Sequence, residues 1–132
     1  QLEDTPSQLA LTGREMAMLA CYDCGGFFAP HYDGFGHQPD SFENKRVLTA
    51  IYYFNHGWKR SDGGALRVFP EQSTHEDLLP DDDSLVLLRA DTLQHEVRLT
   101  HRQRWAITMW FHGTCDGQGN AKEQKRLELR RD

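Results

Sequence analysis

The sequence lacks the features that would place the protein in a membrane or on a nucleic acid. It has no apolar run near the roughly 18 residues that a membrane-spanning helix needs, and no charged and then apolar targeting segment opens it. The net charge is −5, and the lysines and arginines are scattered apart from a cluster near the C-terminus. A nucleic-acid-binding surface would be basic. We therefore expect that the partner is neither a nucleic acid nor a membrane.

Cysteine is scarce as well. Cys21, Cys24 and Cys115 are an odd number of cysteines and cannot form a closed disulfide framework. Cys21 and Cys24 have the Cys-x-x-Cys spacing of a redox motif or of half a zinc site, but no second pair exists and the motif does not open a helix. We expect reduced, structural thiols, and hence a cytoplasmic or nuclear protein.

The chain is short for a complete enzyme. Its 132 residues suffice for one domain with a real core, and no repeat or internal linker divides them. Because the first residue is Gln rather than Met, we expect that the chain is a fragment of a longer protein. Residues 113–132 are mostly polar and are expected to form a C-terminal tail or a helix.

Short runs of β-branched and aromatic residues alternate with turns through the middle of the chain. Turn segments rich in Gly, Pro and Asp separate these runs. Eight strands are expected, at 16–22, 26–31, 46–55, 65–70, 76–79, 84–90, 94–99 and 104–112. This spacing is typical of a double-sheet jelly roll, so the predicted fold class is all-β, a double-stranded β-helix. Only the two ends, 6–16 and 121–131, have the composition of helices.

The last predicted strand has two faces of different character, because side chains alternate along a strand. One face is uniformly apolar and is expected to be packed core: Trp105, Ile107, Met109 and Phe111. The other face mixes a cation and a hydroxyl into an apolar row, which is typical of a pocket wall: Arg104, Ala106, Thr108 and Trp110. An unpaired buried cation is costly, so Arg104 should reach solvent or meet an anion.

A histidine two residues before an aspartate occurs twice, as His31 with Asp33 and as His75 with Asp77. On a strand, two residues with this spacing point the same way, about 6–7 Å apart, and can converge on one metal ion. His31 and Asp33 end a predicted strand. His75 and Asp77 lie in an acidic, polar stretch that is expected to be an exposed loop, so the first pair is the better candidate.

An iron site made of two histidines and one carboxylate needs a third ligand from another strand. Five histidines are candidates: His37, His56, His95, His101 and His112. Placement favours His95, because it opens a predicted strand just before the strand that carries Arg104. The spacing by itself leaves the other four open.

Longer motifs carry a resemblance to a known family. The segments RVLTAIYYFN (46–55), GGALRVFPE (63–71) and HEVRLTHRQRWAITMWF (95–111) follow one another in this order. With the segment around His31 and Asp33, they resemble the catalytic core of the prolyl 4-hydroxylase family of 2-oxoglutarate/Fe(II) dioxygenases. Within that family the sequence is most similar to the hypoxia-inducible-factor prolyl hydroxylases. The resemblance extends from about Gly13 to His112.

The resemblance implies a role for ten residues. His31, Asp33 and His95 would be the Fe(II) ligands, with no catalytic side chain beyond this metal site. Arg104 would bind the distal carboxylate of the cosubstrate 2-oxoglutarate, and Tyr53 would donate a hydrogen bond to it. The rest of the cosubstrate pocket would be lined by Tyr22, Ile51, Leu66, Thr108 and Trp110. Ascorbate is implied as a reductant.

The implied activity is hydroxylation of prolyl residues in a protein or peptide, with dioxygen as oxidant. Arg104 stands where collagen-type relatives usually have Lys, which favours the oxygen-sensor branch and a role in the hypoxia response. Asp33 argues against the halogenase variant of this scaffold, which lacks that carboxylate. Three departures stand out: the loop 34–45 differs from the sensor enzymes, Gln94 replaces a Pro, and the family's N-terminal helical cover is expected to be missing.

Two alternatives stay open. The same chemistry could act on a free amino acid or on another protein side chain. Alternatively, the chain could be an inactive jelly roll that binds a metal or a peptide without turnover. A zinc-bound, cupin-like protein would leave Arg104 without a purpose.

Overall fold

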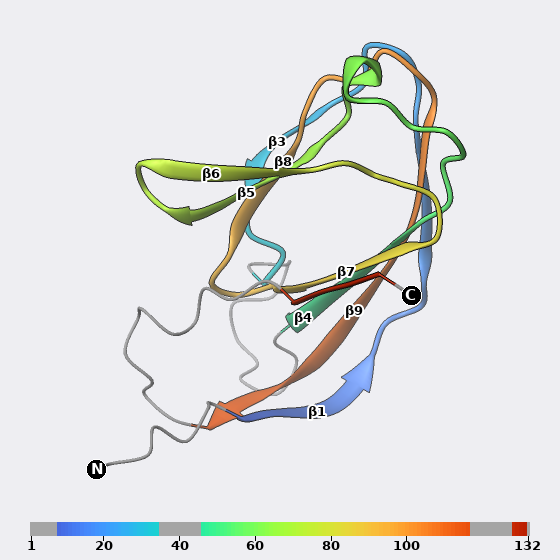
Figure 1. The fold of residues 1–132 in the computed structure, drawn as a ribbon. Coiled ribbons are helices and arrows are strands. Elements are labelled where there is room, and N and C mark those ends of the chain that lie inside the picture. Colours follow the sequence, from blue (N-terminus) through green and yellow to red (C-terminus); the bar gives the residue numbers. More distant parts are fainter. Residues whose placement is uncertain (1–7, 35–45, 117–127, 132) are drawn as a thin grey trace.

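The computed structural model describes residues 8–34, 46–116 and 128–131, and its regular structure there is almost entirely strand (Figure 1). The strands are β1 (Gln8–Arg14), β2 (Met18–Tyr22), β3 (Phe28–His31), β4 (Arg46–Tyr53), β5 (Leu66–Glu71), β6 (Thr74–Leu78), β7 (Ser84–Arg89), β8 (Gln94–Val97), β9 (Arg104–Asp116) and β10 (Glu128–Arg131). One short 3-10 helix, η1 (Arg60–Asp62), interrupts them. The described part of the chain contains no helix that is long and apolar enough to cross a membrane.

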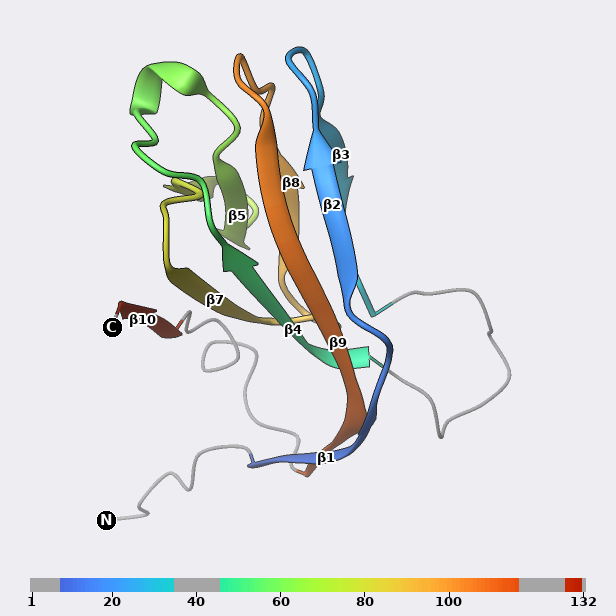
Figure 2. The ribbon, with the colours of Figure 1, turned by 90° about the vertical axis from the view of Figure 1, so that its right-hand side faces the viewer.

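Two antiparallel sheets face each other. The larger has the order β1-β9-β4-β7-β10, with β2 also pairing with β9, and the smaller has the order β3-β8-β5-β6. From β4 to β9 the chain crosses between the sheets repeatedly, and Figure 2 shows β2, β9 and β4 on one side of the molecule with β3, β8 and β5 on the other. This arrangement confirms the predicted jelly roll.

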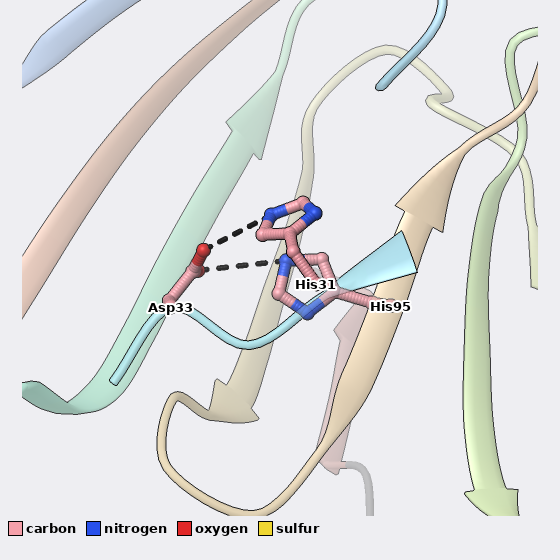
Figure 3. Close-up of side chains that lie close together, drawn as sticks. All are labelled: His31, Asp33 and His95. Atoms are coloured by element: carbon pink, nitrogen blue, oxygen red, sulfur yellow. Dashed lines mark ion pairs between the residues drawn. The ribbon is translucent and has the colours of Figure 1, made fainter. Parts of the chain in front are cut away.

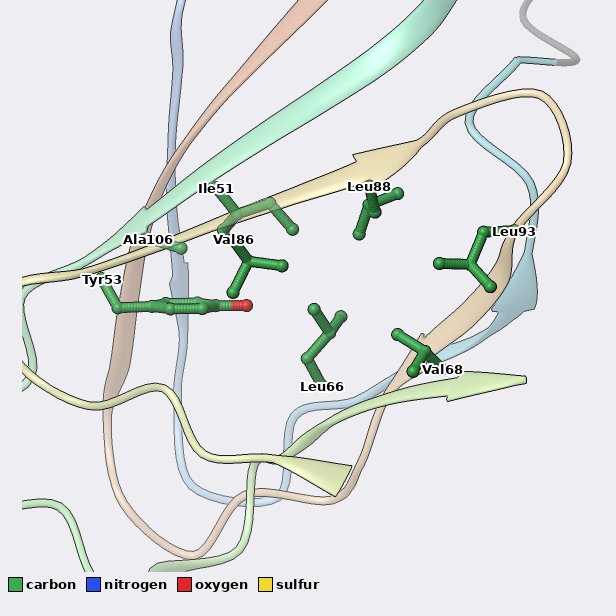
Figure 4. Packing of buried hydrophobic residues seen from close by; sticks show 8 residues of the cluster. All are labelled: Ile51, Tyr53, Leu66, Val68, Val86, Leu88, Leu93 and Ala106. Carbon is green, nitrogen blue, oxygen red and sulfur yellow. The ribbon is translucent and has the colours of Figure 1, made fainter. Parts of the chain in front are cut away.

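The core lies between the two sheets (Figure 4). It consists of eight buried residues, seven on strands β4, β5, β7 and β9 and one, Leu93, just before β8: Ile51, Tyr53, Leu66, Val68, Val86, Leu88, Leu93 and Ala106. The alternation of side chains along a strand explains which residues are buried. Ile51 and Tyr53 are at most 7% exposed, whereas Tyr52 between them is 37% exposed. Removing each large aliphatic side chain from water stabilises the fold by about 1.5–3 kcal/mol.

All eight predicted strands are present, with ends that differ by a few residues, but the predicted helical ends are wrong. Residues 8–14 form β1, in which Leu9 lies opposite Cys115 and Leu11 lies opposite Gly113 of β9. Residues 128–131 form β10, which pairs with β7. In both places a neighbouring strand edge offers backbone hydrogen bonds that outweigh a weak local preference for helix. Residues 121–127 of the second predicted helix lie outside the described part.

The expected packed core on β9 is also wrong. Ile107 lies in register between Leu19 of β2 and Tyr52 of β4, and Tyr52 lies opposite Leu85 of β7. These four side chains are 36–61% exposed, so they form an apolar row on the outer face of the larger sheet. The face that carries Arg104 points inward instead. A period of two separates the faces of a strand but does not say which one is covered.

The two described cysteine side chains, Cys21 and Cys24, are free thiols and are exposed. Cys21 lies on β2. Cys24 follows in a turn that is closed by a hydrogen bond of 2.8 Å from the backbone N–H of Gly26 to the carbonyl of Asp23.

Candidate metal centre

The structure brings His31, Asp33 and His95 together (Figure 3). His31 ends β3 and lies opposite His95 of β8, with the two ring centroids 4.4 Å apart. Asp33 follows in the next turn and points between the two rings, with its carboxylate oxygens 3.2 Å from Nε2 of His31 and 3.5 Å from Nε2 of His95. Neighbouring ligands of an octahedral ion at about 2.1 Å lie about 3 Å apart, so the cluster fits one such ion.

Hydrogen bonds hold each of the three side chains in place. Nδ1 of His31 lies 2.7 Å from the carbonyl of Ala29, and Nδ1 of His95 lies 3.2 Å from the carbonyl of Leu93. A proton on each Nδ1 leaves the Nε2 lone pair free for a metal. The hydroxyl of Thr49 donates to Oδ2 of Asp33 at 2.7 Å.

The electrostatics of the cluster suit a cation. Burial opposes ionisation of Asp33, but the neighbouring His31, His95, Thr49 and Trp110 together lower its pKa from 3.8 to about 2. Burial lowers the pKa of His95, which favours the neutral ring that a metal requires. Burial also acts to lower the pKa of His31, but the hydrogen bonds to Asp33 and to the Ala29 carbonyl, together with the charge of Asp33, outweigh burial and raise the pKa.

The other candidate histidines are not part of this cluster, or lie outside the described residues. His56, His101 and His112 do not belong to the cluster, which is the only group of metal-binding character among the described residues. His37 lies outside those residues. His75 and Asp77 are on strand β6 rather than in the expected loop, where His75 is exposed and Asp77 accepts a hydrogen bond of 2.7 Å from Arg67.

A cavity of about 440 Å³ opens beside the three residues, between the two sheets. All ten residues that the resemblance assigned to the site line it: Tyr22, His31, Asp33, Ile51, Tyr53, Leu66, His95, Arg104, Thr108 and Trp110. Seven further residues line it, of which the sequence had placed only Ala106 on a pocket wall: Met18, Ala20, Phe28, Tyr32, Arg46, Val97 and Ala106. Residues from both sheets therefore enclose one space that holds a potential metal site and a cation.

Arg104 is the cation, and it is only 2% exposed. Its Nε donates to the carbonyl of Gly64 at 2.7 Å, and its Nη2 donates to the hydroxyl of Tyr53 at 3.1 Å. Within the described chain no carboxylate forms an ion pair with it. A buried guanidinium in a cavity without a counter-ion is a binding site for an anion.

Tyr53 can assist in binding that anion. It is fully buried, and burial raises the pKa of its hydroxyl, which keeps the proton. Since the hydroxyl oxygen accepts from Arg104, its own proton remains available for a carboxylate oxygen. The cavity thus has a metal-binding end and an anion-binding group, which together suit a dicarboxylic acid.

Arg46 is a cavity-lining residue that the strand period concealed. Its neighbours Val47 and Thr49 are the inward residues, so Arg46 is out of phase with the cavity. The register of β4 against β9 shifts between Arg46 and Leu48, and such a bulge re-aims a side chain. The guanidinium of Arg46 stacks over Trp110 at 4.0 Å and donates twice to Glu15, at 2.5 and 2.6 Å. In the sequence, an arginine at the start of a predicted strand does not indicate that its side chain lines a cavity.

Comparisons with known proteins agree with this geometry. The model of the family described as the 2OG-Fe(II) oxygenase superfamily matches residues 17–112, which include all ten assigned residues. The chain is 40% identical over 103 residues to a hypoxia-inducible factor prolyl hydroxylase of Caenorhabditis elegans, covering 75% of this chain and 13% of that protein.

Two solved structures are similar in fold. A prolyl-4-hydroxylase of Pseudomonas putida has a TM-score of 0.69 and 33% identity, and the match covers 77% of this chain and 54% of that one. A prolyl hydroxylase of Trichoplax adhaerens, in complex with a peptide fragment of the hypoxia inducible factor oxygen degradation domain, has a TM-score of 0.67 and 28% identity, with coverage of 88% and 48%. The chain therefore spans less than two thirds of each of these relatives.

Proposed function

This chain belongs to the 2OG-Fe(II) oxygenase superfamily, and we propose that it hydroxylates prolyl residues of a protein or peptide. The observation that carries the proposal is the content of one cavity. His31, Asp33 and His95 offer ligand atoms within 4.8 Å of one another, and the unpaired Arg104 lines the same space. Two histidines with one carboxylate are the ligand set of non-haem Fe(II) oxygenases.

The residues of this chain would hold the iron and its cosubstrate. Fe(II) would lie on Nε2 of the two histidines and on the carboxylate of Asp33, which Thr49 orients. When bound, iron and 2-oxoglutarate supply the oxidation of a C–H bond to C–OH by dioxygen, with succinate and CO2 as further products. Arg104 and Tyr53 would bind the distal carboxylate. The apolar side chains of Ile51 and Leu66 would exclude water from the carbon chain of 2-oxoglutarate, between its keto acid group and its distal carboxylate.

Support for a prolyl substrate comes from the relatives. The nematode protein is named a hypoxia-inducible factor prolyl hydroxylase, and the Trichoplax enzyme was solved with a peptide of that factor. We extend the proposal to ascorbate as a reductant and to an oxygen-sensor role in the cytoplasm or the nucleus. The second candidate substrate is a different protein side chain. It is favoured by two departures from the sequences of the sensor enzymes: the loop that follows Asp33, and Gln94 in place of a Pro.

The test is incubation of the chain with Fe(II), 2-oxoglutarate, ascorbate and a proline-containing peptide. We expect succinate together with one added oxygen atom on the proline, located by fragment mass spectrometry. A matched peptide with alanine in place of proline should gain none. Oxygen on another residue would favour the second candidate, and binding of iron or peptide without succinate would favour a non-enzymatic module.

A further inference from the structure

The backbone of Gly64 fixes the orientation of the buried Arg104. Nε of Arg104 donates to the Gly64 carbonyl at 2.7 Å, a contact between residues 40 positions apart. A guanidinium has five N–H donors, and a carboxylate can approach it either side-on, at Nε and one Nη, or end-on, at the two Nη atoms. Because Nε is engaged by Gly64, the side-on approach is closed.

The remaining donors of the guanidinium are on its two Nη atoms. Nη2 spends one of its two protons on Tyr53, at 3.1 Å. One proton of Nη2 and both protons of Nη1 therefore remain for an incoming carboxylate. The Gly64 carbonyl thus sets the direction from which a carboxylate can meet Arg104.

The segment that presents this carbonyl is fastened to its surroundings. The backbone N–H of Gly64 donates to Leu99 at 2.9 Å, and Thr100 exchanges hydrogen bonds of 2.7 and 3.0 Å with Gly25 and Gly26. Thr100 is fully buried. The Gly64 carbonyl therefore does not depend on a mobile side chain for its position.

A side chain at position 64 would be strained and tightly packed. Its φ of +65° is a conformation that side-chain-bearing residues rarely adopt. A Cβ there would lie 3.0 Å from Oγ1 of Thr100 and 3.1 Å from Cδ of Arg104. Any side chain would thus push against the stem of Arg104 itself.

We propose that Gly64 is a positioning residue for the cosubstrate, whose carbonyl directs Arg104 so that it binds the distal carboxylate through its Nη atoms and not through Nε. This inference rests on the proposed function, because it concerns the same anion site. The Gly64 carbonyl, and not Arg104 alone, would then determine the direction from which the carboxylate binds.

The test is Gly64→Ala, studied by calorimetric titration of the Fe(II)-loaded protein in the absence of oxygen. Two ligands are compared: 2-oxoglutarate, and 2-oxopentanoate, which has the same keto acid end but a methyl group in place of the distal carboxylate. We expect the Kd of 2-oxoglutarate to rise about tenfold or more, the loss of one well-placed charged hydrogen bond. The Kd of 2-oxopentanoate should not change.

Gly57→Ala is the matched control. Gly57 has nearly the same φ, +64°, but a Cβ there would meet nothing within 4 Å. It carries the same backbone strain without the contact to Arg104, so both Kd values should stay at the wild-type level. Gly64→Ala behaving like Gly57→Ala, or weakening both ligands alike, would overturn the inference.

A measurement on the wild-type protein covers the case in which Gly64→Ala does not fold. The Nε–H of Arg104 should give an NMR signal with slow hydrogen exchange, identified by its absence in Arg104→Lys. Hydrogen exchange as fast as that of the exposed arginines would refute the hydrogen bond from Nε of Arg104 to the Gly64 carbonyl. Wild-type protein that binds no 2-oxoglutarate would instead overturn the proposed function, and this inference with it.

Discussion

Nη2 of Arg104 donates a hydrogen bond of 3.1 Å to the hydroxyl of Tyr53, joining two buried residues that are 51 positions apart. The guanidinium carbon also lies 5.0 Å from the centre of the Tyr53 ring. Strands β4 and β9 are neighbours in the larger sheet, so a cation and a phenol that are remote in sequence form one anion-binding unit.

Loss of either member of this unit should weaken 2-oxoglutarate binding. Arg104→Ala removes a charged pair worth a few kcal/mol, so the Kd should rise roughly a hundredfold or more. Tyr53→Phe removes one neutral donor and should raise it about tenfold. Anaerobic titration of the Fe(II) protein, followed by the visible absorption that appears with 2-oxoglutarate, measures both. An unchanged Kd in Arg104→Ala would refute this anion site.

Removal of a metal ligand should abolish both iron retention and turnover. His31→Ala and His95→Ala each leave two of the three ligands of the cluster. The matched control is His75→Ala, which removes the exposed histidine of the other His-x-Asp pair. Iron content after gel filtration and succinate production are the measurements. A His75→Ala protein without iron would show that His75 and Asp77, rather than His31 and Asp33, hold the metal.

Thr49→Val should weaken iron binding without removing a ligand. The substitution keeps the shape of the side chain but deletes the donor that holds Oδ2 of Asp33 at 2.7 Å. Outer hydrogen bonds of this kind change metal affinity by about 10–100-fold. Competition with a metal chelator gives the affinity, and the exposed Thr74→Val on β6 serves as the control. Equal affinities in the two variants would contradict the role of Thr49.

Glu15 should contribute to stability in a pH-dependent way. Hydrogen bonds from Arg46, aided by His112, outweigh burial and lower the pKa of Glu15 from 4.5 to about 2. The folded-state pKa lies below the unfolded one, so the contribution is present above pH 4.5 and is lost as the pH falls toward 2. Glu15→Gln should cost about 1 kcal/mol at pH 7, because the pair is partly exposed. Melting curves should show the difference from wild type shrinking between pH 4.5 and pH 2.5, and a constant difference would contradict it.

The two faces of β7 should respond differently to truncation. Leu88 is 2% exposed and belongs to the core, whereas Leu85 on the same strand is 36% exposed on the outer face. Leu88→Ala should destabilise the fold by about 2–5 kcal/mol and Leu85→Ala by less than about 1 kcal/mol. Urea unfolding measures both. Equal losses would mean that the outer face is packed as tightly as the core.

Much of the fold was predictable because strands carry a local signal. The alternation in 46–53 identifies Ile51 and Tyr53 as one face, and both are buried. The ends of the chain were not predictable, because 8–14 and 128–131 become strands only by pairing with β9 and β7. Backbone pairing with a remote partner leaves no mark in a local pattern.

The candidate site, too, was predictable only in part. His31 and Asp33 were recognisable by spacing, and His95 and Arg104 by long motifs. Arg46 was concealed by a bulge, and Gly64 contributes only a backbone carbonyl that no side-chain pattern reports.

By itself, the amino-acid order determined the eight inner strands, the type of fold and the identity of the chemical groups. Only the tertiary structure decided which face of β9 is inward, that the two ends of the described chain form β1 and β10, and that Arg104 has no anionic partner among the described residues. The physical reason is that side-chain period and composition are local, whereas burial and charge pairing depend on which strands become neighbours.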